Sequence, residues 1–280
     1  MENLKSLLSR HNLTLKKAFG QNFLSDNALL SEIVQKAGVT ENDTVLEIGC
    51  GAGALTKELG LKAKKVVGYE IDTRLKPLLN EVLSDYKNVE IVFEDVMKQR
   101  LSDVEKKLGG EYIMVANLPY YITTPIVMRF IEEAKNIKAM VIMVQEEVAF
   151  RFASEKSTAD YGAITVGINL RGSAEVILKV PREKFTPVPN VDSAVVKILI
   201  DKTKFSNVNF NAVRNVVRCA FSSRRKMLVN NLMNVFKLSR ADAESALTLA
   251  GLDLTVRGEN LSAEEYVALT EKLIDKGVKL

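Results

Sequence analysis

The sequence predicts an α/β fold with a mainly parallel sheet, followed by a small all-α C-terminal domain. Between residues 44 and 147, short apolar runs alternate with helix-type apolar periodicity, which is typical of βαβ units with right-handed crossovers. From about residue 207 to the end, the apolar spacing is helical throughout. We therefore place a domain boundary near residues 201–206.

Each element of this pattern has a local signal. A helix that begins after Asp26 and ends at Gly38 precedes the first strand, because these residues suit its N-cap and its C-terminus. Five apolar runs are expected to form parallel strands, at residues 44–48, 65–70, 89–93, 112–116 and 139–144. Their connecting helices are expected to begin near residues 54, 74, 103, 123 and 146.

The pattern changes after residue 161. Three later apolar runs are separated by short links, so we expect strands that pair antiparallel at the sheet edge, at residues 163–170, 175–180 and 191–200. The last part of the chain is expected to contain four helices, at residues 209–221, 224–236, 239–249 and 263–276.

Composition narrows the class of protein. With 47% hydrophobic and 26% charged residues and no long apolar run, the chain is expected to be globular, with no membrane span. Residues 1–20 lack the apolar segment of a signal peptide, and two cysteines are too few for a zinc cluster, which favours a cytoplasmic protein. His11 is the only histidine, so neither a Ser-His triad nor a histidine metal site is expected, and no metal is predicted.

The net charge of +4 is concentrated near the C-terminus. Residues 1–200 carry 26 basic and 26 acidic residues, whereas residues 201–280 carry 13 and 9. Nine basic residues and no acid lie between Lys202 and Arg240, with their centre at residues 218–226. Such a block is typical of a nucleic-acid-binding surface, and the alternative is a solvated helix face.

A glycine loop follows the first parallel strand. Gly49, Gly51 and Gly53 allow the backbone to turn sharply and to approach a ligand closely. Glu70 lies nineteen residues after Gly51, where a carboxylate can accept hydrogen bonds from both ribose hydroxyls, and Asp95 follows the third strand, within reach of an adenine amine. An adenosine-containing cofactor is predicted. The Gly-x-Gly-x-Gly spacing favours S-adenosylmethionine over NAD, and the alternative is an ordinary βα turn.

A polar-aromatic corner follows the fourth strand. Asn117 can both donate and accept hydrogen bonds, Pro119 stiffens the turn, and Tyr120 offers a flat face for stacking. Because ligands of open α/β sheets bind at the carboxyl ends of the strands, this corner predicts a clamp for a planar ring with an amino group. The alternative is an ordinary strand-to-helix turn.

These stretches resemble the KsgA-type family of small-subunit ribosomal RNA adenine dimethyltransferases. The resemblance extends over nearly the whole chain and is carried by residues 19–24, 45–53, 70–72, 94–96, 117–122, 185–189, 191–193, 221 and 224–226. It implies a Rossmann-like S-adenosylmethionine-dependent methyltransferase domain at residues 1–203, with a seven-stranded mixed sheet and an RNA and cofactor lid at residues 1–26. It also implies a helical RNA-binding domain at residues 204–280. Cys50 departs from the proline of many relatives, but only its backbone is expected to face the ligand.

The resemblance assigns roles to individual residues. It implies that the cofactor is bound by Asn22, Leu24, Gly49, Gly51, Glu70, Asp95 and Asn117. The implied catalytic residues are Asn117, Leu118, Pro119, Tyr120 and Phe185. RNA phosphates are expected to bind Arg218, Arg224, Arg225 and Lys226. For Phe185 the alternative is a core residue between strands, and for Asn22 and Leu24 it is a polar N-terminal loop.

The family methylates two adjacent adenosines near the 3′ end of small-subunit (16S) RNA, so the expected partner is this RNA in an immature small subunit, with a monomeric enzyme. The Asn117 side chain and a carbonyl of Leu118 or Pro119 would accept the N–H groups of a flipped adenine stacked on Tyr120. Three rivals remain open. They are a macrolide-resistance methyltransferase of large-subunit RNA, a non-catalytic assembly factor on the same fold, and an NAD-linked oxidoreductase.

Overall fold

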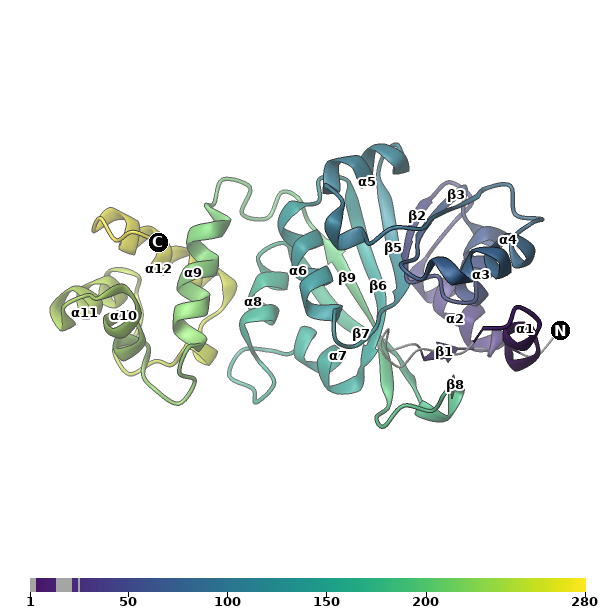
Figure 1. Ribbon diagram of the computed structural model, residues 1–280. Helices are drawn as coiled ribbons and strands as arrows, with labels where there is room; N and C mark the ends of the chain where they lie inside the picture. Colours follow the sequence, from purple (N-terminus) through teal and green to yellow (C-terminus); the bar gives the residue numbers. More distant parts are fainter. Residues whose placement is uncertain (1–3, 14–21, 25) are drawn as a thin grey trace. The chain divides into compact units, whose positions relative to one another are not determined.

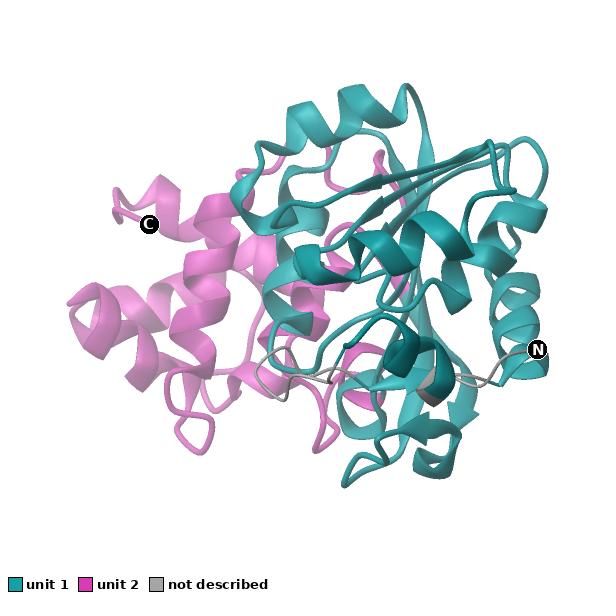
Figure 2. Cartoon of the chain, turned by 45° about the vertical axis from the view of Figure 1, so that its right-hand side comes forward, with its two compact units in different colours: residues 1–149, 174–200 teal, residues 150–173, 201–280 magenta. Residues whose placement is uncertain are grey.

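The computed structural model describes residues 4–13, 22–24 and 26–280. The chain divides into two compact units, the first made of Met1–Ala149 with Ala174–Ile200 and the second of Phe150–Ser173 with Asp201–Leu280 (Figure 2). The change of unit at residue 201 lies close to the predicted boundary between residues 203 and 204. Residues 150–173, which we expected in the first domain, belong instead to the unit that contains the C-terminal helices.

A mixed sheet forms the centre of the first unit. Its strands are β2 (Thr44–Ile48), β3 (Lys65–Tyr69), β4 (Val89–Val92), β5 (Tyr112–Asn117), β6 (Ile137–Gln145), β7 (Gly172–Val180) and β9 (Ser193–Ile200). They lie in the order β4-β3-β2-β5-β6-β9-β7 (Figure 1). Neighbouring strands from β4 to β6 are parallel, whereas β9 pairs antiparallel with β6. The seven-stranded mixed sheet predicted from the family resemblance is therefore confirmed.

The helices of this part of the chain bury apolar side chains in the cores of the first unit. They are α1 (Leu4–Arg10), α2 (Asn27–Ala37), α3 (Ala54–Lys62), α4 (Lys76–Val82), α5 (Leu101–Leu108), α6 (Thr123–Glu133) and α7 (Glu146–Phe152). Short 3₁₀ turns, η2 (Thr73–Leu75) and η3 (Val96–Lys98), precede α4 and α5. The predicted ends of α2 are confirmed. Asp26 accepts a hydrogen bond from the Leu29 N–H at 3.1 Å, and Gly38 ends the helix with φ +75°.

The strand order brings four predicted residues to one edge of the sheet. β4, β3, β2 and β5 are adjacent and parallel, so their carboxyl ends lie together. Asp95 follows β4, Glu70 follows β3, Gly49 follows β2, and Asn117 ends β5. Groups far apart in sequence thus converge where open α/β sheets bind ligands.

A second, two-stranded sheet was not predicted. Its strands are β1 (Phe23–Leu24) and β8 (Phe185–Thr186), which run antiparallel with Leu24 opposite Phe185. This pairing joins the segment before α2 to the connection between β7 and β9. It joins part of the expected lid to the rest of the first unit, whereas residues 1–3, 14–21 and 25 of that lid lie outside the described residues.

Helices make up most of the second unit. They are α8 (Ala163–Asn169), α9 (Phe210–Phe221), α10 (Leu228–Phe236), α11 (Arg240–Leu249), the 3₁₀ turn η5 (Gly258–Asn260) and α12 (Ala263–Asp275). The four C-terminal helices were predicted, but the strand predicted at residues 163–170 is wrong, because α8 occupies this segment. Its β-branched residues have high strand propensity, yet Val166 and Leu170 are buried in the apolar core of the helical unit. Packing against the other helices overrides that propensity.

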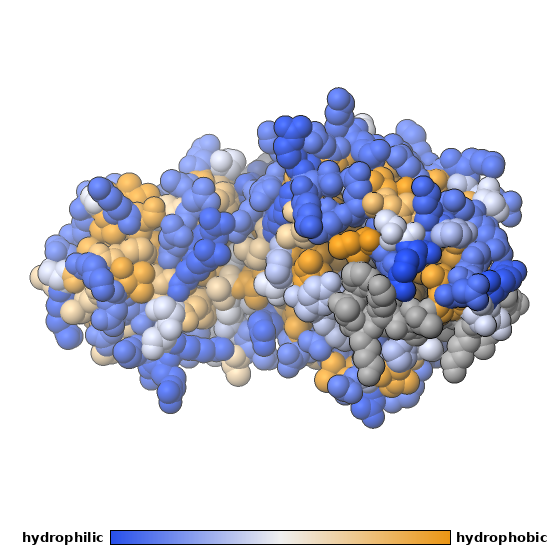
Figure 3. All heavy atoms as spheres, viewed as in Figure 1, coloured by the Kyte–Doolittle hydropathy of each residue, from blue (hydrophilic) through white to orange (hydrophobic). Residues whose placement is uncertain are grey.

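Hydrophilic residues cover most of the face shown in Figure 3, as expected for a chain with 26% charged residues. Among the helices of the described ranges, none combines the length and hydrophobicity needed to cross a membrane.

Candidate active site

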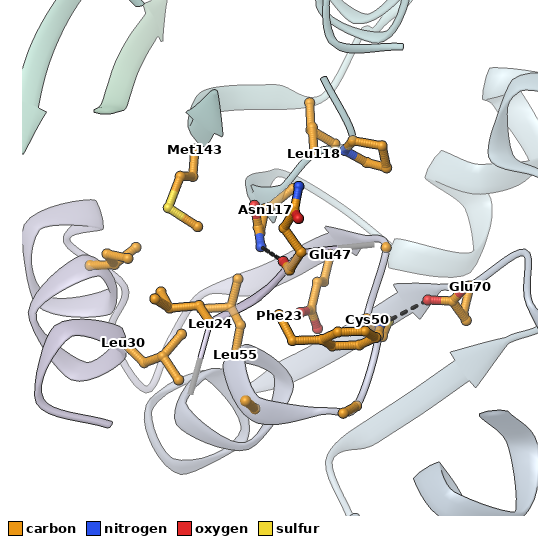
Figure 4. A pocket seen from close by; sticks show the side chains of 18 of the residues that line it. Phe23, Leu24, Leu30, Glu47, Cys50, Leu55, Glu70, Asn117, Leu118 and Met143 are labelled. Carbon is orange, nitrogen blue, oxygen red and sulfur yellow. Dashed lines mark hydrogen bonds between the residues drawn. The ribbon is translucent and has the colours of Figure 1, made fainter. Parts of the chain in front are cut away.

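A pocket lies at the carboxyl edge of the parallel strands (Figure 4). It brings together nine of the predicted site residues, namely Asn22, Leu24, Gly49, Gly51, Glu70, Asn117, Leu118, Pro119 and Tyr120. Side chains of the corner after β5 and of the segment before α2 therefore face the same space as the glycine loop. Asp95 and Phe185 do not line this pocket.

The glycine loop and Glu70 are joined by hydrogen bonds. The Gly51 N–H donates to one Glu70 oxygen at 2.8 Å, and the Asp72 N–H donates to the other at 2.8 Å. Burial raises the pKa of the Glu70 carboxyl, although these two hydrogen bonds oppose the shift. Each carboxylate oxygen has more than one lone pair, so both can still accept from a ligand hydroxyl.

Asn117 donates from its side-chain amide to the backbone carbonyl of Asn22 at 3.2 Å. This contact uses the amide nitrogen, so the side-chain oxygen is available to accept a hydrogen bond from a ligand. The neighbouring Pro119 carbonyl already accepts from the Ile122 N–H at 3.1 Å and from the Thr123 hydroxyl at 3.2 Å. Of the two backbone carbonyls that the sequence offered as acceptors, the one at Leu118 is therefore favoured.

Tyr120 is held by a hydrogen bond to a residue that lies 73 positions further along the chain. Its hydroxyl hydrogen-bonds with the Ser193 hydroxyl at 2.8 Å, and Ser193 is fully buried at the start of β9. Burial raises the pKa of the Tyr120 phenol, so the phenol remains protonated at neutral pH. The hydrogen bond fixes the ring, which is what a stacking surface requires.

The structure places Phe185 in the core rather than at the pocket. Its side chain is 2% exposed and belongs to the same apolar cluster as Leu24 and Val180. The core alternative for Phe185 is thus the one that the geometry favours. Asp95 caps η3, where one carboxylate oxygen accepts from the Met97 N–H at 2.9 Å. Asp95 follows β4, and β4 lies next to β3, the strand that Glu70 follows.

Sequence reasoning missed Glu47 as a group that faces the pocket. Glu47 lies in β2, is 1% exposed and lines the pocket. Its Oε2 atom is buried and accepts no hydrogen bond from the described residues. Burial raises the pKa of Glu47 to about 8. The available signal was a glutamate inside an otherwise apolar strand, directly before the glycine loop.

The predicted RNA-binding cations do not all lie in the same environment. Arg218, Arg225 and Lys226 are exposed. Arg224 is exposed as well, but it forms an ion pair with Glu259 at 2.6 Å and donates to the Ala159 carbonyl at 2.6 Å. Its guanidinium thus ties two loops of the helical unit together, which is a structural role. The phosphate contact of Arg224 stays a prediction.

Substituting the adjacent arginines should separate these two roles. Arg224→Ala removes the ion pair and the surface hydrogen bonds to loop carbonyls, so we expect it to lower the free energy of unfolding by about 0.5–1 kcal/mol. Arg225→Ala should leave stability unchanged and reduce the salt dependence of RNA binding by about one counterion. Urea denaturation and RNA binding titrations over a range of salt concentrations measure both effects. An unchanged salt dependence for Arg225→Ala would contradict the assignment of a phosphate contact.

The fold and the pocket together define a class of protein. A parallel sheet with a glycine loop and a ribose-directed carboxylate, beside an Asn-Leu-Pro-Tyr corner, is the arrangement of an S-adenosylmethionine-dependent methyltransferase that acts on an amine. Residues 12–275 match the family described as ribosomal RNA adenine dimethylase, and the chain belongs to this family. Membership confirms the predicted enzyme class, and the family uses S-adenosylmethionine as methyl donor.

Similar proteins cover almost the whole chain. Ribosomal RNA small subunit methyltransferase A of Bacillus licheniformis is 42% identical, over 96% of this chain and 94% of the relative. The protein of the same name from Geobacillus thermodenitrificans is 43% identical, with the same coverage. Among solved structures, a dimethyladenosine transferase from Plasmodium falciparum has a TM-score of 0.76 at 26% identity and covers 91% of this chain and 98% of its own. The 23S rRNA methyltransferase ErmE has a TM-score of 0.68 at 30% identity, with 90% and 100% covered.

Proposed function

We propose that this enzyme transfers methyl groups from S-adenosylmethionine to the exocyclic amines of two adjacent adenosines near the 3′ end of small-subunit (16S) ribosomal RNA, giving dimethyladenosines. The observation that carries the proposal is the orientation of Asn117. Its amide nitrogen is engaged by Asn22, so its oxygen and the Leu118 carbonyl are the acceptors that the corner after β5 offers at the pocket. Relatives named for the small subunit, at 42–43% identity over 96% of the chain, support this choice of RNA.

The residues present suit the methyl donor. The backbone of the glycine loop, the Glu70 carboxylate and Asp95 would hold its adenosine part, and Asn22 and Leu24 would border its methionine part. Glu47 adds a buried carboxyl oxygen, Oε2, with no hydrogen-bond partner among the described residues. A sulfonium compound supplies a methyl group that is already activated, so the protein has to align the amine and exclude water.

An adenine amine is a weak nucleophile because its lone pair is delocalised into the ring. Hydrogen bonds from its two N–H groups to the Asn117 oxygen and the Leu118 carbonyl would draw the nitrogen towards tetrahedral geometry and free the lone pair. Tyr120, fixed through Ser193, would stack on the flipped base and contribute about 1–3 kcal/mol. No histidine is needed for this step.

RNA phosphates would contact the exposed Arg218, Arg225 and Lys226 in the helical unit. We propose an immature small ribosomal subunit as the partner, in the compartment where ribosomes are assembled, with the enzyme acting as a monomer. The macrolide-resistance alternative has one specific observation in its favour, the similarity to the 23S rRNA methyltransferase ErmE.

Methyl transfer to isolated subunits tests the proposal. Small and large subunits from cells that lack this gene are incubated with the enzyme and labelled S-adenosylmethionine. We expect label only in the small-subunit RNA, together with new stops of reverse transcriptase at two adjacent adenosines near its 3′ end, since dimethylated adenine blocks base pairing. Label in the large-subunit RNA would favour the macrolide-resistance alternative. The absence of label in both would favour a non-catalytic assembly factor.

A further inference from the structure

The segment Asn22–Leu24, called the strap here, lies at the pocket and contacts the catalytic corner directly. The backbone carbonyl of Asn22 accepts the hydrogen bond from the Asn117 side chain at 3.2 Å, although the two residues are 95 positions apart. Figure 4 shows this hydrogen bond as the dashed line beside Asn117. The position of the strap therefore determines whether the Asn117 amide can donate its hydrogen bond to the Asn22 carbonyl.

Packing of the Phe23 side chain holds the strap in place. Its ring is 8% exposed and belongs to an apolar cluster that includes Leu75 and Leu78 below the glycine loop. The ring also packs on Gly51, where an added Cβ atom would lie only 2.9 Å from Phe23 Cε1. Figure 4 shows Phe23 beside the loop. The residues that flank Phe23 thus have little freedom to move away from the pocket.

The direction of the Asn117 side chain matters for chemistry. A primary amide presents an oxygen on one side and an NH₂ group on the other, and a half-turn of the side chain exchanges them. The contact with Asn22 selects the orientation in which the nitrogen faces the strap. The oxygen then remains for an incoming amine.

We propose that Phe23 is a positioning residue of the methyl-transfer step. By holding the Asn22 carbonyl on the Asn117 amide, Phe23 keeps the Asn117 oxygen turned towards the amine of the target base. The identity of that amine rests on the proposed function. The orientation of Asn117 does not depend on it. Phe23 also lines the pocket, so the simpler interpretations are that it only fills the apolar cluster or only contacts a bound ligand.

Single-turnover methyl transfer at saturating cofactor and RNA separates these interpretations. We expect Phe23→Ala to lower the rate about 10-fold, since small misplacements of reacting groups are costly. Phe23→Leu, which refills most of the volume, should restore most of the rate. Leu78→Ala, a matched truncation in the same cluster, should change the rate by less than about 2-fold. Equal losses for Phe23→Ala and Leu78→Ala would overturn the proposal.

A double-mutant cycle tests whether Phe23 acts through Asn117. In the Asn117→Ala background, we expect Phe23→Ala to change the residual rate by less than about 2-fold, because the group that it positions is absent. The same 10-fold effect in both backgrounds would overturn the proposal.

Nuclear magnetic resonance of asparagine-labelled protein gives a readout without catalysis. The side-chain amide signal of Asn117 is identified by its loss in Asn117→Ala. We expect this signal to move in Phe23→Ala and to stay in place in Phe23→Leu and Leu78→Ala. A signal that does not move in Phe23→Ala would overturn the positioning role. If the wild-type enzyme methylates neither subunit, the proposed function fails, and the position of this signal still decides the role of Phe23.

Discussion

Asn117→Ala is expected to lower the rate of methyl transfer by about two to three orders of magnitude. The substitution removes the side-chain oxygen that accepts from the target amine, an interaction that strengthens as the nitrogen becomes tetrahedral, and such contacts are typically worth this much. It also removes the link to the Asn22 carbonyl. Because the oxygen acts mainly in the transition state, kcat should fall far more than the affinity for the RNA.

Labelled methyl transfer to immature small subunits measures this effect. Asn42→Ala serves as a matched control, since Asn42 is an exposed asparagine in the turn before β2. The control should retain wild-type kinetics. A fully active Asn117→Ala enzyme would remove the central role that we give to this side chain, and the assignment of the pocket as the site of methyl transfer would lose its main support.

The sequence predicts those parts of the site that depend on residues close together in the chain. The glycine loop, Glu70 and Asn117 each follow a recognisable strand, and parallel strands must bring their carboxyl ends to one edge. Contacts between residues that are far apart in the chain could not be predicted. The pairing of Leu24 with Phe185, and of Tyr120 with Ser193, joins segments that no local pattern connects.

Burial and competing partners explain the other differences. The sequence alone cannot distinguish a phenylalanine that stacks on a base from one that packs in the core. Only the structure shows that the Phe185 ring is buried. The basic run likewise contains Arg224 and Arg225 side by side, and sequence cannot tell that the first is paired with Glu259. The strand predicted at residues 163–170 failed because helix packing outweighed the propensity of β-branched residues.

Glu47 should make the stability of the protein depend on pH. Its pKa is about 8 in the folded protein, against an ordinary value of 4.5, because the carboxyl is buried. Between these two values the folded state holds a proton that the unfolded state has released. The contribution of Glu47 to stability is therefore fully present below about pH 4.5 and is lost as the pH rises towards 8. The loss can reach about 1.4 kcal/mol per pH unit.

Glu47→Gln removes this titration, because glutamine keeps the shape but cannot ionise. We expect the free energy of unfolding of Glu47→Gln, relative to wild type, to rise by on the order of 2–5 kcal/mol between pH 5 and pH 8. Urea denaturation of the cofactor-free proteins at constant ionic strength measures it. Glu41→Gln, at an exposed turn position, controls for the change in net charge. A difference between Glu47→Gln and wild type that stays constant with pH would show that Glu47 is ionised in the folded protein at neutral pH.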